Sequence, residues 1–355
     1  MKEPVVFTQP LVAKAITEPN GNATPVISVI VPFYNASMTL DRLLRSIKQQ
    51  TFPKFEVIGI DDGSSDNSSS IFNHFRKSDD RFILLKQHNM GQTLARLAGL
   101  KQARGRLVTF ADADDFVDER WLSLLYTTMI KHNADISMCA FDNYSPERQS
   151  YYTSRFPSKN VVWNKKSAMH AWLIDEQFKG FLWNKLYKKS LLDRINMRPD
   201  FNFMEDVYIN GQALKLAEVV VSCQEVGYHY VVNPQSKMHS SFLVQDAKAF
   251  YCLTSFIKTA ADEQNLTDAG QIRIIKIAMA TIERMKRSDV KQNKELLHEV
   301  FNQVKSLSPI AYNYFKRPTR FFLFWIKSTG KVFLPLKFRR KVVMFRDHLI
   351  NRRID

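Results

Sequence analysis

The chain has 355 residues, of which 45% are hydrophobic and 24% charged, and its formal net charge is +16. This composition excludes collagen-like, repeat and disordered proteins, and the length favours one larger domain with a smaller one appended. Three widely spaced cysteines without a CxxC motif (Cys139, Cys223 and Cys252) argue against a disulfide framework or a zinc site, so a reducing compartment is expected.

The first 25 residues are expected to form an N-terminal extension. They lack the charged and apolar regions of a secretory signal, so export is not expected. After them, short β-branched runs alternate with helical patterns such as Leu40, Leu43, Leu44 and Ile47 at i, i+3, i+4, i+7. The expected strands are Val26–Phe33, Phe55–Ile60, Arg81–Leu85, Leu107–Phe110 and Asp135–Phe141.

This alternation predicts an α/β fold with a mostly parallel sheet flanked by helices. We expect the α/β domain to span residues 26–240 and a helical C-terminal module to span residues 241–355. Ligands of such sheets bind at the carboxyl ends of the strands, so the residues that follow each strand are the first candidates for chemistry.

Two adjacent carboxylates, Asp61 and Asp62, follow the second expected strand and precede a turn at Gly63 and Ser64. Helix capping by the polar residues after the turn explains part of this pattern. It does not explain two acids at the end of a strand. A carboxylate there can accept hydrogen bonds from a base or a ribose.

Three further carboxylates (Asp112, Asp114 and Asp115) follow the strand Leu107–Phe110. Like charges this close repel each other unless a cation neutralises them, and oxygen ligands favour Mg²⁺ or Mn²⁺. The alternative is a solvated acidic turn before a helix. Because acids directly after an apolar strand are a costly way to make a turn, we favour the metal.

The ordered set of motifs resembles glycosyltransferase family 2. It consists of Ile27-Ser28-Val29-Ile30-Val31-Pro32-Phe33-Tyr34-Asn35, then Asp61-Asp62-Gly63-Ser64, then Asp112-Ala113-Asp114-Asp115. The resemblance covers roughly residues 26–241 and implies a GT-A fold. It implies nucleoside contacts for Pro32, Tyr34 and Asp62, a position near the ribose for Asp112, and metal binding by Asp114 or Asp115.

The same resemblance assigns further residues to the site. The segment His88–Arg96 is similar to a loop that encloses the nucleotide, with Arg96 as the contact, although Leu97 replaces the asparagine common in the family. Glu205-Asp206 is similar to the family's acidic pair, which implies that Asp206 is the general base that an acceptor hydroxyl needs. Alone, such a dipeptide is usually just a helix N-terminus.

Two more segments are weaker candidates. Trp183-Asn184-Lys185 resembles a family stretch on the acceptor side, although simple packing is the commoner role of such an aromatic residue. Lys237 and His239 lie in a segment similar to a loop that closes over the diphosphate, and a solvated loop is the alternative.

The resemblance implies an inverting, metal-dependent transfer of one sugar from a nucleoside diphosphate donor, most commonly UDP, to a cell-surface glycan or lipid-linked acceptor. No Gln-x-x-Arg-Trp motif follows Asp206, which favours single-sugar transfer over processive synthesis. A cytoplasmic location is expected, since no apolar run reaches the length of a membrane span.

The C-terminal tail from Lys316 onward contains twelve Lys or Arg and two acidic residues, interleaved with Phe and Trp. Basic segments with aromatic residues bind anionic membrane surfaces, so peripheral attachment to the membrane is a hypothesis. A solvated helical face and a partner-binding helix are the alternatives.

Two other functions compete with sugar transfer. The sequence pI near 9.6 is compatible with nucleic-acid binding, but the basic excess lies in the tail and the acidic clusters would repel phosphates, so no nucleic acid is expected as a partner. A nucleotidyltransferase would need a basic, glycine-rich loop after the first strand, and Val31–Asn35 offers none.

Overall fold

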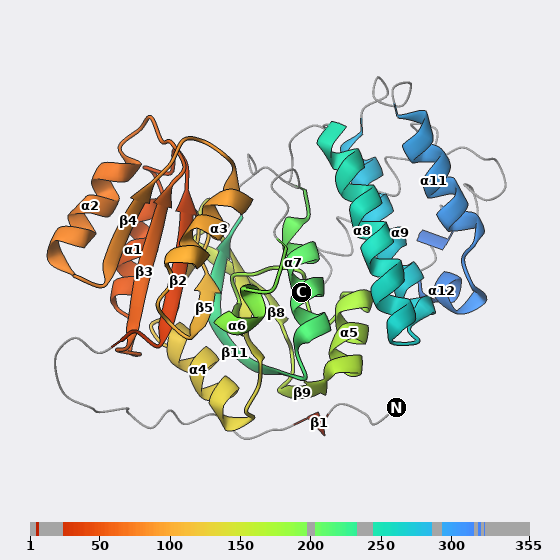
Figure 1. Ribbon diagram of the computed structural model, residues 1–355, viewed down its shortest axis with the longest axis horizontal. Helices are drawn as coiled ribbons and strands as arrows, with labels where there is room; N and C mark the ends of the chain where they lie inside the picture. The colour runs from red at the N-terminus through yellow and green to blue at the C-terminus, as the bar shows by residue number, and fades with distance from the viewer. Residues whose placement is uncertain are drawn as a thin grey trace. The chain divides into compact units, whose positions relative to one another are not determined.

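The computed structural model describes residues 5–6, 24–196, 203–232, 244–285, 293–315, 319–320 and 323. The chain divides into two compact units, shown with their labelled elements in Figure 1. The first consists of Met1–Trp172 and Glu176–Asn233, and the second of Leu173–Asp175 and Pro234–Asp355. Both units are described separately below.

Four parallel strands form one half of the sheet in the first unit, here called the parallel half. In spatial order they are β5 (Leu107–Phe110), β2 (Ile27–Phe33), β3 (Phe55–Asp61) and β4 (Phe82–Lys86). The register aligns the end of β2 with the end of β3 and places the end of β5 beside Ile30. The segments that follow these strands therefore emerge at one edge of the sheet.

The other half, here called the mixed half, continues the sheet beyond β5. Its main strands are β10 (Lys185–Lys188), β7 (Ile136–Ser145) and β11 (Val219–Val231). Because β10 is antiparallel to both β5 and β7, and β11 is parallel to β7, the ends of β7 and β11 lie at the same edge as the end of β5. Four short strands complete the sheet: β1 (Val5–Val6) and β9 (Val161–Asn164) beyond β11, β6 (Phe116–Val117) on β11, and β8 (Ser150–Phe156) on β7.

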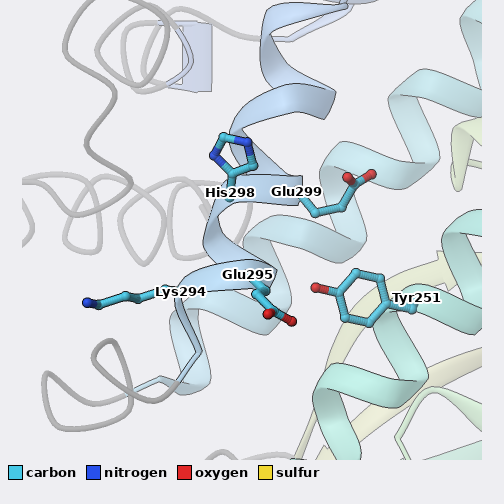
Figure 2. Close-up of a pocket in the computed structure, with 5 residues that line it drawn as sticks. All are labelled: Tyr251, Lys294, Glu295, His298 and Glu299. Carbon is cyan, nitrogen blue, oxygen red and sulfur yellow. The ribbon is translucent and has the colours of Figure 1, made fainter.

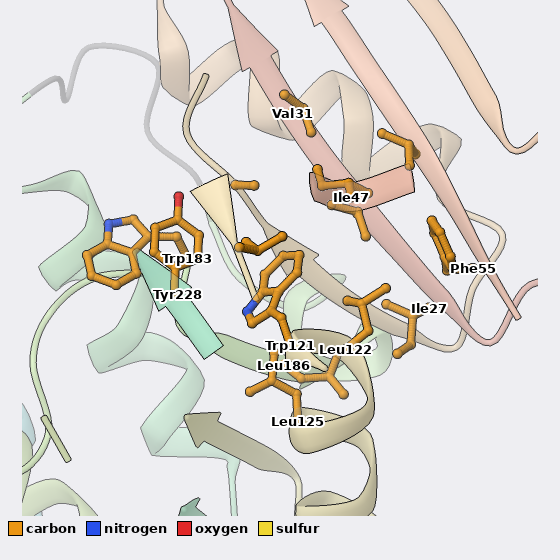
Figure 3. Packing of buried hydrophobic residues seen from close by; sticks show 14 of the residues in the cluster. Ile27, Val31, Ile47, Phe55, Trp121, Leu122, Leu125, Trp183, Leu186 and Tyr228 are labelled. Carbon is orange, nitrogen blue, oxygen red and sulfur yellow. The ribbon is translucent and has the colours of Figure 1, made fainter. Parts of the chain in front are cut away.

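Helices cover both faces of the parallel half (Figure 1). Val29, Val31 and Phe33 pack with α1 (Leu40–Lys48), α2 (Ser68–Ser78) and α4 (Trp121–Lys131) in one buried cluster, part of which Figure 3 shows. Alternate residues of a strand point to opposite faces, so Ile30 points away from this cluster and meets α3 (Gln92–Gln102). A Cβ on Gly99 of α3 would lie 2.6 Å from Ile30, so glycine permits this close approach.

The helix α4 also packs on β7, β10 and β11, and three further described helices belong to the mixed half: α5 (Lys165–Ile174), α6 (Lys189–Leu192) and α7 (Glu205–Leu216). The helix α7 begins directly after Met204, whose backbone is left-handed with a φ of 56°. Asn210 fixes α7 against the sheet, because its side chain accepts a hydrogen bond from the hydroxyl of Tyr187 in β10 at 2.8 Å. The first turn of α7 therefore has a defined position.

The second unit is helical in its described part, with α8 (Val244–Glu263), α9 (Thr267–Arg284), α11 (Lys294–Lys305) and α12 (Pro309–Tyr314). The buried Arg273 of α9 forms a salt bridge of 2.7 Å with Asp175 of the same unit. A shallow pocket, lined by Tyr251, Lys294, Glu295, His298 and Glu299, opens beside α8 and α11 (Figure 2). None of the described helices is both long and apolar enough to cross a membrane.

The α/β class expected from the sequence is confirmed. The five expected strands are all present, shifted at their ends by at most four residues. The strands of the mixed half other than β7 were not anticipated. The domain bounds 26–240 and 241–355 stay predictions, and most of the basic tail lies outside the described residues. All three cysteines are free.

Candidate active site

The loops after β2 and β3 are bound to each other at the edge of the sheet. Asn35, with a left-handed φ of 48°, donates from its backbone N–H to the hydroxyl of Ser64 at 3.0 Å. The side-chain oxygen of Asn35 accepts from the backbone N–H of Ser65 at 2.9 Å, and Asp66 accepts from the N–H of Ser37 at 3.0 Å. These contacts give the rim around Tyr34 a fixed shape.

The paired carboxylates after β3 have different partners. Asp61 accepts from the N–H of Ser64 at 2.8 Å and from the hydroxyl of Ser69, so it fixes the turn and the start of α2. Asp62 is 4% exposed and accepts from the backbone N–H groups of Met90 and Gly91 at 2.9 and 2.8 Å. Its carboxylate therefore organises the loop that leads into α3.

This loop also packs closely on the turn after Asp62. Gly63 has a φ of 82°, and a Cβ there would lie 2.9 Å from the backbone N of Asn89. Glycine is thus required both by the turn and by the approach of the loop. The side chain of Gln87 adds a hydrogen bond of 2.7 Å to Asp62.

Pro32 and Tyr34 differ in exposure although they are neighbours. Pro32 is buried in β2, whereas Tyr34 is 51% exposed at the rim. An exposed aromatic ring on a fixed loop offers a flat surface for a planar group such as a nucleobase. Of the two residues, Tyr34 therefore has the surface to contact a ligand in this structure.

The three carboxylates after β5 also separate into different environments. Asp115 is fully buried and accepts from the hydroxyl of Tyr228 and from the N–H of Val231, both at 2.8 Å. Burial raises the pKa of Asp115 well above its usual value, and the charges of Asp114 and Asp112 raise it further. Both oxygens of Asp115 are engaged inside the protein, whereas the other two carboxylates are partly exposed.

A single buried guanidinium connects the loop after β5 with the start of α7. Arg96 of α3 has a side chain that is 2% exposed, and it donates to Asp112 at 3.1 Å, to Glu205 at 3.3 Å and to Asp206 at 2.7 Å. Burial lowers the pKa of Arg96, but the three carboxylates outweigh burial and raise it. The guanidinium is therefore permanently cationic, and it brings together two acidic motifs that are about ninety residues apart in the sequence.

The ionisation of Asp206 is shifted toward neutral pH. Burial raises its pKa to about 7, and the charges of Glu205 and Asp112 act in the same direction, while Arg96 opposes the shift. Its side chain is still 20% exposed, so a ligand can reach it. A carboxylate that is accessible and titrates near neutral pH is suited to proton transfer.

The segment Trp183-Asn184-Lys185 lies inside the protein. The three residues are at most 2% exposed. Lys185 donates to the carbonyls of Lys179 and Phe181 at 2.9 and 2.5 Å, and to Asn184 at 2.8 Å. In this structure the three side chains offer no surface to an acceptor and instead hold the preceding loop.

The site motifs coincide with a known family profile. Residues 28–204 match the family described as glycosyl transferase family 2. The chain belongs to glycosyl transferase family 2. The resemblance first seen in the sequence motifs is thereby confirmed, and the chain contains a glycosyltransferase domain of this family.

Curated relatives of this chain include bacterial glycosyltransferases. The uncharacterized glycosyltransferase EpsJ of Bacillus subtilis (strain 168) is 31% identical over 217 residues, which are 60% of this chain and 62% of the relative. A Campylobacter jejuni protein named GalNAc(5)-diNAcBac-PP-undecaprenol beta-1,3-glucosyltransferase is 32% identical over 179 residues, or 50% of this chain and 56% of the relative. The match thus spans less than two thirds of these relatives.

The fold of the family 2 chain is also found in solved structures. A crystal structure of S. aureus TarS 1-349 in complex with UDP superposes with a TM-score of 0.63 at 19% identity. The superposition covers 85% of this chain and 87% of that structure. At this identity the likeness establishes a shared fold.

The family 2 domain offers a donor set that suits a hard divalent cation. Among the described residues, no three His, Cys, Asp or Glu side chains are arranged to hold a metal on their own. Mg²⁺ usually needs only one or two carboxylates and completes its shell with substrate phosphates. The partly exposed carboxylates of Asp112 and Asp114 fit that requirement better than Asp115, which is fully buried.

Several residues of this family 2 site escaped the sequence analysis. Tyr228, which supports Asp115, belongs to no recognisable motif. Gln92 donates to Asp112 at 3.1 Å and lies within the segment His88–Arg96, where only Arg96 was expected to make a contact. Asn210 lies one turn after Asp206 in α7, a spacing that could have marked it as a neighbour of the base. Lys237 and His239 lie outside the described residues.

Proposed function

We propose that the chain is an inverting, metal-dependent glycosyltransferase that transfers one sugar from a nucleoside diphosphate donor to a hydroxyl group. UDP is the proposed nucleotide, and the proposed acceptor is a cell-surface glycan or a lipid-linked acceptor. The proposed location of the protein is the cytoplasm. Support comes from the names of the relatives and from TarS, whose structure contains UDP. Peripheral attachment to the membrane through the basic tail belongs to the same proposal.

The observation that carries the proposal is the contact of Arg96 with both Asp112 and Asp206. In a parallel sheet the ligand binds at the carboxyl ends of the strands, where Tyr34, Asp62 and Asp112 are found. Arg96 links this edge to a carboxylate that can act as a base. A donor held by the loops of the parallel half would therefore lie next to a proton acceptor.

Asp114, together with Asp112, is the proposed holder of a Mg²⁺ or Mn²⁺ ion. Such an ion, when bound with the donor, would neutralise the charge that develops on the leaving diphosphate. Tyr34 would stack on the base, and Asp62 would keep the loop before α3 in place over the nucleoside. These roles need no movement of the buried residues.

Asp206 is the proposed general base. The acceptor oxygen attacks the anomeric carbon while the bond from that carbon to the donor phosphate breaks, and the hydroxyl proton passes to Asp206. Because attack comes from the face opposite the leaving group, the configuration inverts. A pKa of about 7 leaves much of Asp206 ionised at neutral pH, and Arg96 fixes the direction of its carboxylate.

The test is a panel of UDP- and GDP-sugars with Mn²⁺ or Mg²⁺, in which release of the nucleoside diphosphate is measured. We expect release from a UDP-sugar. Asp114→Ala is expected to lower turnover by at least about 100-fold and to weaken donor binding, because the developing charge loses its counterion. An Asp114→Ala variant with wild-type turnover, or no release from any donor, would contradict the proposal.

A further inference from the structure

Four aromatic side chains stack next to the acidic residues that follow β5. The indole of Trp183 is nearly parallel to the rings of Phe181, Tyr228 and Tyr230, with interplanar angles of 13°, 18° and 15°. The ring centroids lie 4.8, 4.4 and 5.9 Å from that of Trp183. Figure 3 shows Trp183 and Tyr228 side by side. Together these four residues are called the aromatic stack below.

The loop that carries Phe181 is held by two buried polar side chains. The ammonium group of Lys185 donates to the carbonyls of Lys179 and Phe181. The amide of Asn210 donates to the carbonyls of Gly180 and Phe181 at 2.6 and 3.2 Å. Burying an ammonium group is costly, and it is offset here by three hydrogen bonds, so the loop conformation is strongly specified.

The same stack is hydrogen-bonded to both acidic motifs of the site. At one end, Tyr228 donates to Asp115 and accepts from the N–H of Asp112 at 3.1 Å. At the other, Asn210 donates to the carbonyl of Asp206 at 2.9 Å as well as to the Phe181 loop. The stack is thus tied to the acidic loop on one side and to the start of α7 on the other.

Two members of the stack are accessible. Trp183 and Tyr228 are buried, whereas Phe181 and Tyr230 are only partly buried. Burial raises the pKa of Tyr230 to about 12, and the charges of Asp115, Asp114 and Asp112 add to the effect. The hydroxyl of Tyr230 therefore stays protonated and lies within the field of the proposed metal-binding carboxylates.

Building on the proposed function, we infer that Phe181 and Tyr230 form the wall against which a pyranose ring of the acceptor packs. One face of a pyranose exposes mainly C–H groups, which pack well on an aromatic surface, while its hydroxyls need polar partners. The stack supplies the aromatic surface. Asp206, whose backbone carbonyl shares the Asn210 amide with the carbonyl of Phe181, supplies a polar partner. Trp183, Lys185 and Asn210 are positioning residues that keep the wall rigid.

Saturation-transfer NMR on the full chain with UDP and Mg²⁺ tests the inference. The probes are the methyl pyranosides of glucose, galactose, mannose and N-acetylglucosamine. We expect saturation to reach the ring C–H protons of at least one probe. Tyr230→Ala and Phe181→Ala should reduce that binding by about 3- to 10-fold, whereas Tyr230→Phe should keep most of it because the ring remains.

The matched control is Tyr251→Ala, which removes a tyrosine of similar size that is 41% exposed at the pocket of the second unit (Figure 2). It should bind the probes as the wild type does. A second readout is UDP binding, measured by calorimetry, which Tyr251→Ala should also leave unchanged. Loss of UDP binding in Tyr230→Ala together with loss of pyranoside binding would point to a general structural defect and overturn the inference.

The remaining outcomes separate the inference from the proposed function. If UDP binds but no pyranoside receives saturation, or if Tyr230→Ala binds the probes like the wild type, the inference is overturned and the proposed function stands. If Tyr230→Ala weakens binding of the UDP-sugar but not of UDP, the wall holds the donor sugar and the acceptor assignment is wrong. If the wild type binds no UDP, the proposed function and the inference both fail.

Discussion

The parallel half and the mixed half of the sheet build their share of the site in different ways. In the parallel half, Tyr34, Asp62 and Asp112 each follow a strand directly, and their loops are held by hydrogen bonds between neighbouring strand ends. In the mixed half, Asp206, the proposed base, and the aromatic stack come from segments far apart in the sequence. The proposed donor side is thus built locally and the proposed acceptor side by long-range packing.

The two halves should therefore differ in how well they tolerate substitutions. The loops after β2 and β3 are held together by exposed hydrogen bonds of serine and asparagine, each of which contributes modestly to stability. The mixed half depends on the buried polar groups of Lys185 and Asn210 and on the guanidinium of Arg96, which α3 supplies from the parallel half. A buried polar group that loses its partner pays a large desolvation cost. Substitutions in the second set should therefore have larger effects.

The largest effect is expected for Arg96→Met, because Arg96 joins the two halves. Its removal leaves Asp112, Glu205 and Asp206 near one another without their shared cation. Breaking such a buried ion pair costs about 3–5 kcal/mol of stability. The free energy of unfolding, followed by tryptophan fluorescence in urea, should fall by this amount, and turnover should be lost with it.

Arg45→Met is the matched control for Arg96→Met. Arg45 pairs with Asp41 on the surface of α1, with side chains that are 67% and 46% exposed. Such exposed pairs contribute up to about 0.5 kcal/mol, so this variant should unfold almost as the wild type does. The destabilisation by Arg96→Met should also shrink in acid, where the carboxylates become neutral. Equal stability of the two variants would contradict the bridging role.

The next largest effect is expected for Asp206→Asn, a substitution that tests the mixed half alone. Asp206→Asn keeps the shape of the side chain but cannot take up a proton, so kcat should fall by about 10²- to 10⁴-fold. UDP binding, measured by calorimetry, should stay close to that of the wild type because Asp206 is not among the proposed nucleotide contacts. Asp41→Asn, an exposed substitution of the same chemistry, is the control. Loss of UDP binding in Asp206→Asn would assign the residue to the donor instead.

The pH profile gives an independent check on Asp206. Burial raises its pKa to about 7, so the ionised form that can accept a proton is lost as the pH falls below that value. The wild-type kcat/KM should therefore decrease about tenfold per pH unit on the acid side. The residual activity of Asp206→Asn should lack this limb. A wild-type profile that stays flat down to pH 5 would rule out Asp206 as the base.

The same contrast explains how much could be predicted from the sequence. Asp62 and Asp112 were found because apolar strands are visible as local runs and acids directly after them stand out. Asp206 has no such local signal, and only the resemblance to a family pointed to it. Tyr230 and Asn210 were missed because their roles arise from stacking and hydrogen bonds across the sheet. Contacts across the sheet leave no period in the sequence, and of these two residues only Asn210 has a local signal, its spacing of four residues from Asp206.

Burial is the other property that the sequence does not reveal. Asp114 and Asp115 are adjacent and chemically alike, yet one is partly exposed and the other is hydrogen-bonded inside the protein. Lys185 lies in a segment that resembles the acceptor side of the family, but its ammonium group is fully buried and bound to carbonyls. Whether each side chain is buried depends on its contacts with distant segments, such as those of Asp115 with β11, and only the folded chain shows these contacts.

The smallest effect is expected in the parallel half, for Tyr34→Ala. Its ring is 51% exposed, so its removal leaves the packing of β2 intact. Loss of one stacked base should cost about 1 kcal/mol, the lower end of the range for base stacking on aromatic residues, or about fivefold in the affinity for UDP. Tyr34→Phe should keep the affinity, and Met38→Ala, in the same loop and 94% exposed, should not change it. Because Tyr34 is proposed to contact the base and neither the diphosphate nor the acceptor, kcat should change little in Tyr34→Ala. A fall in kcat at unchanged affinity would mean that the two halves are not as separable as their architecture indicates.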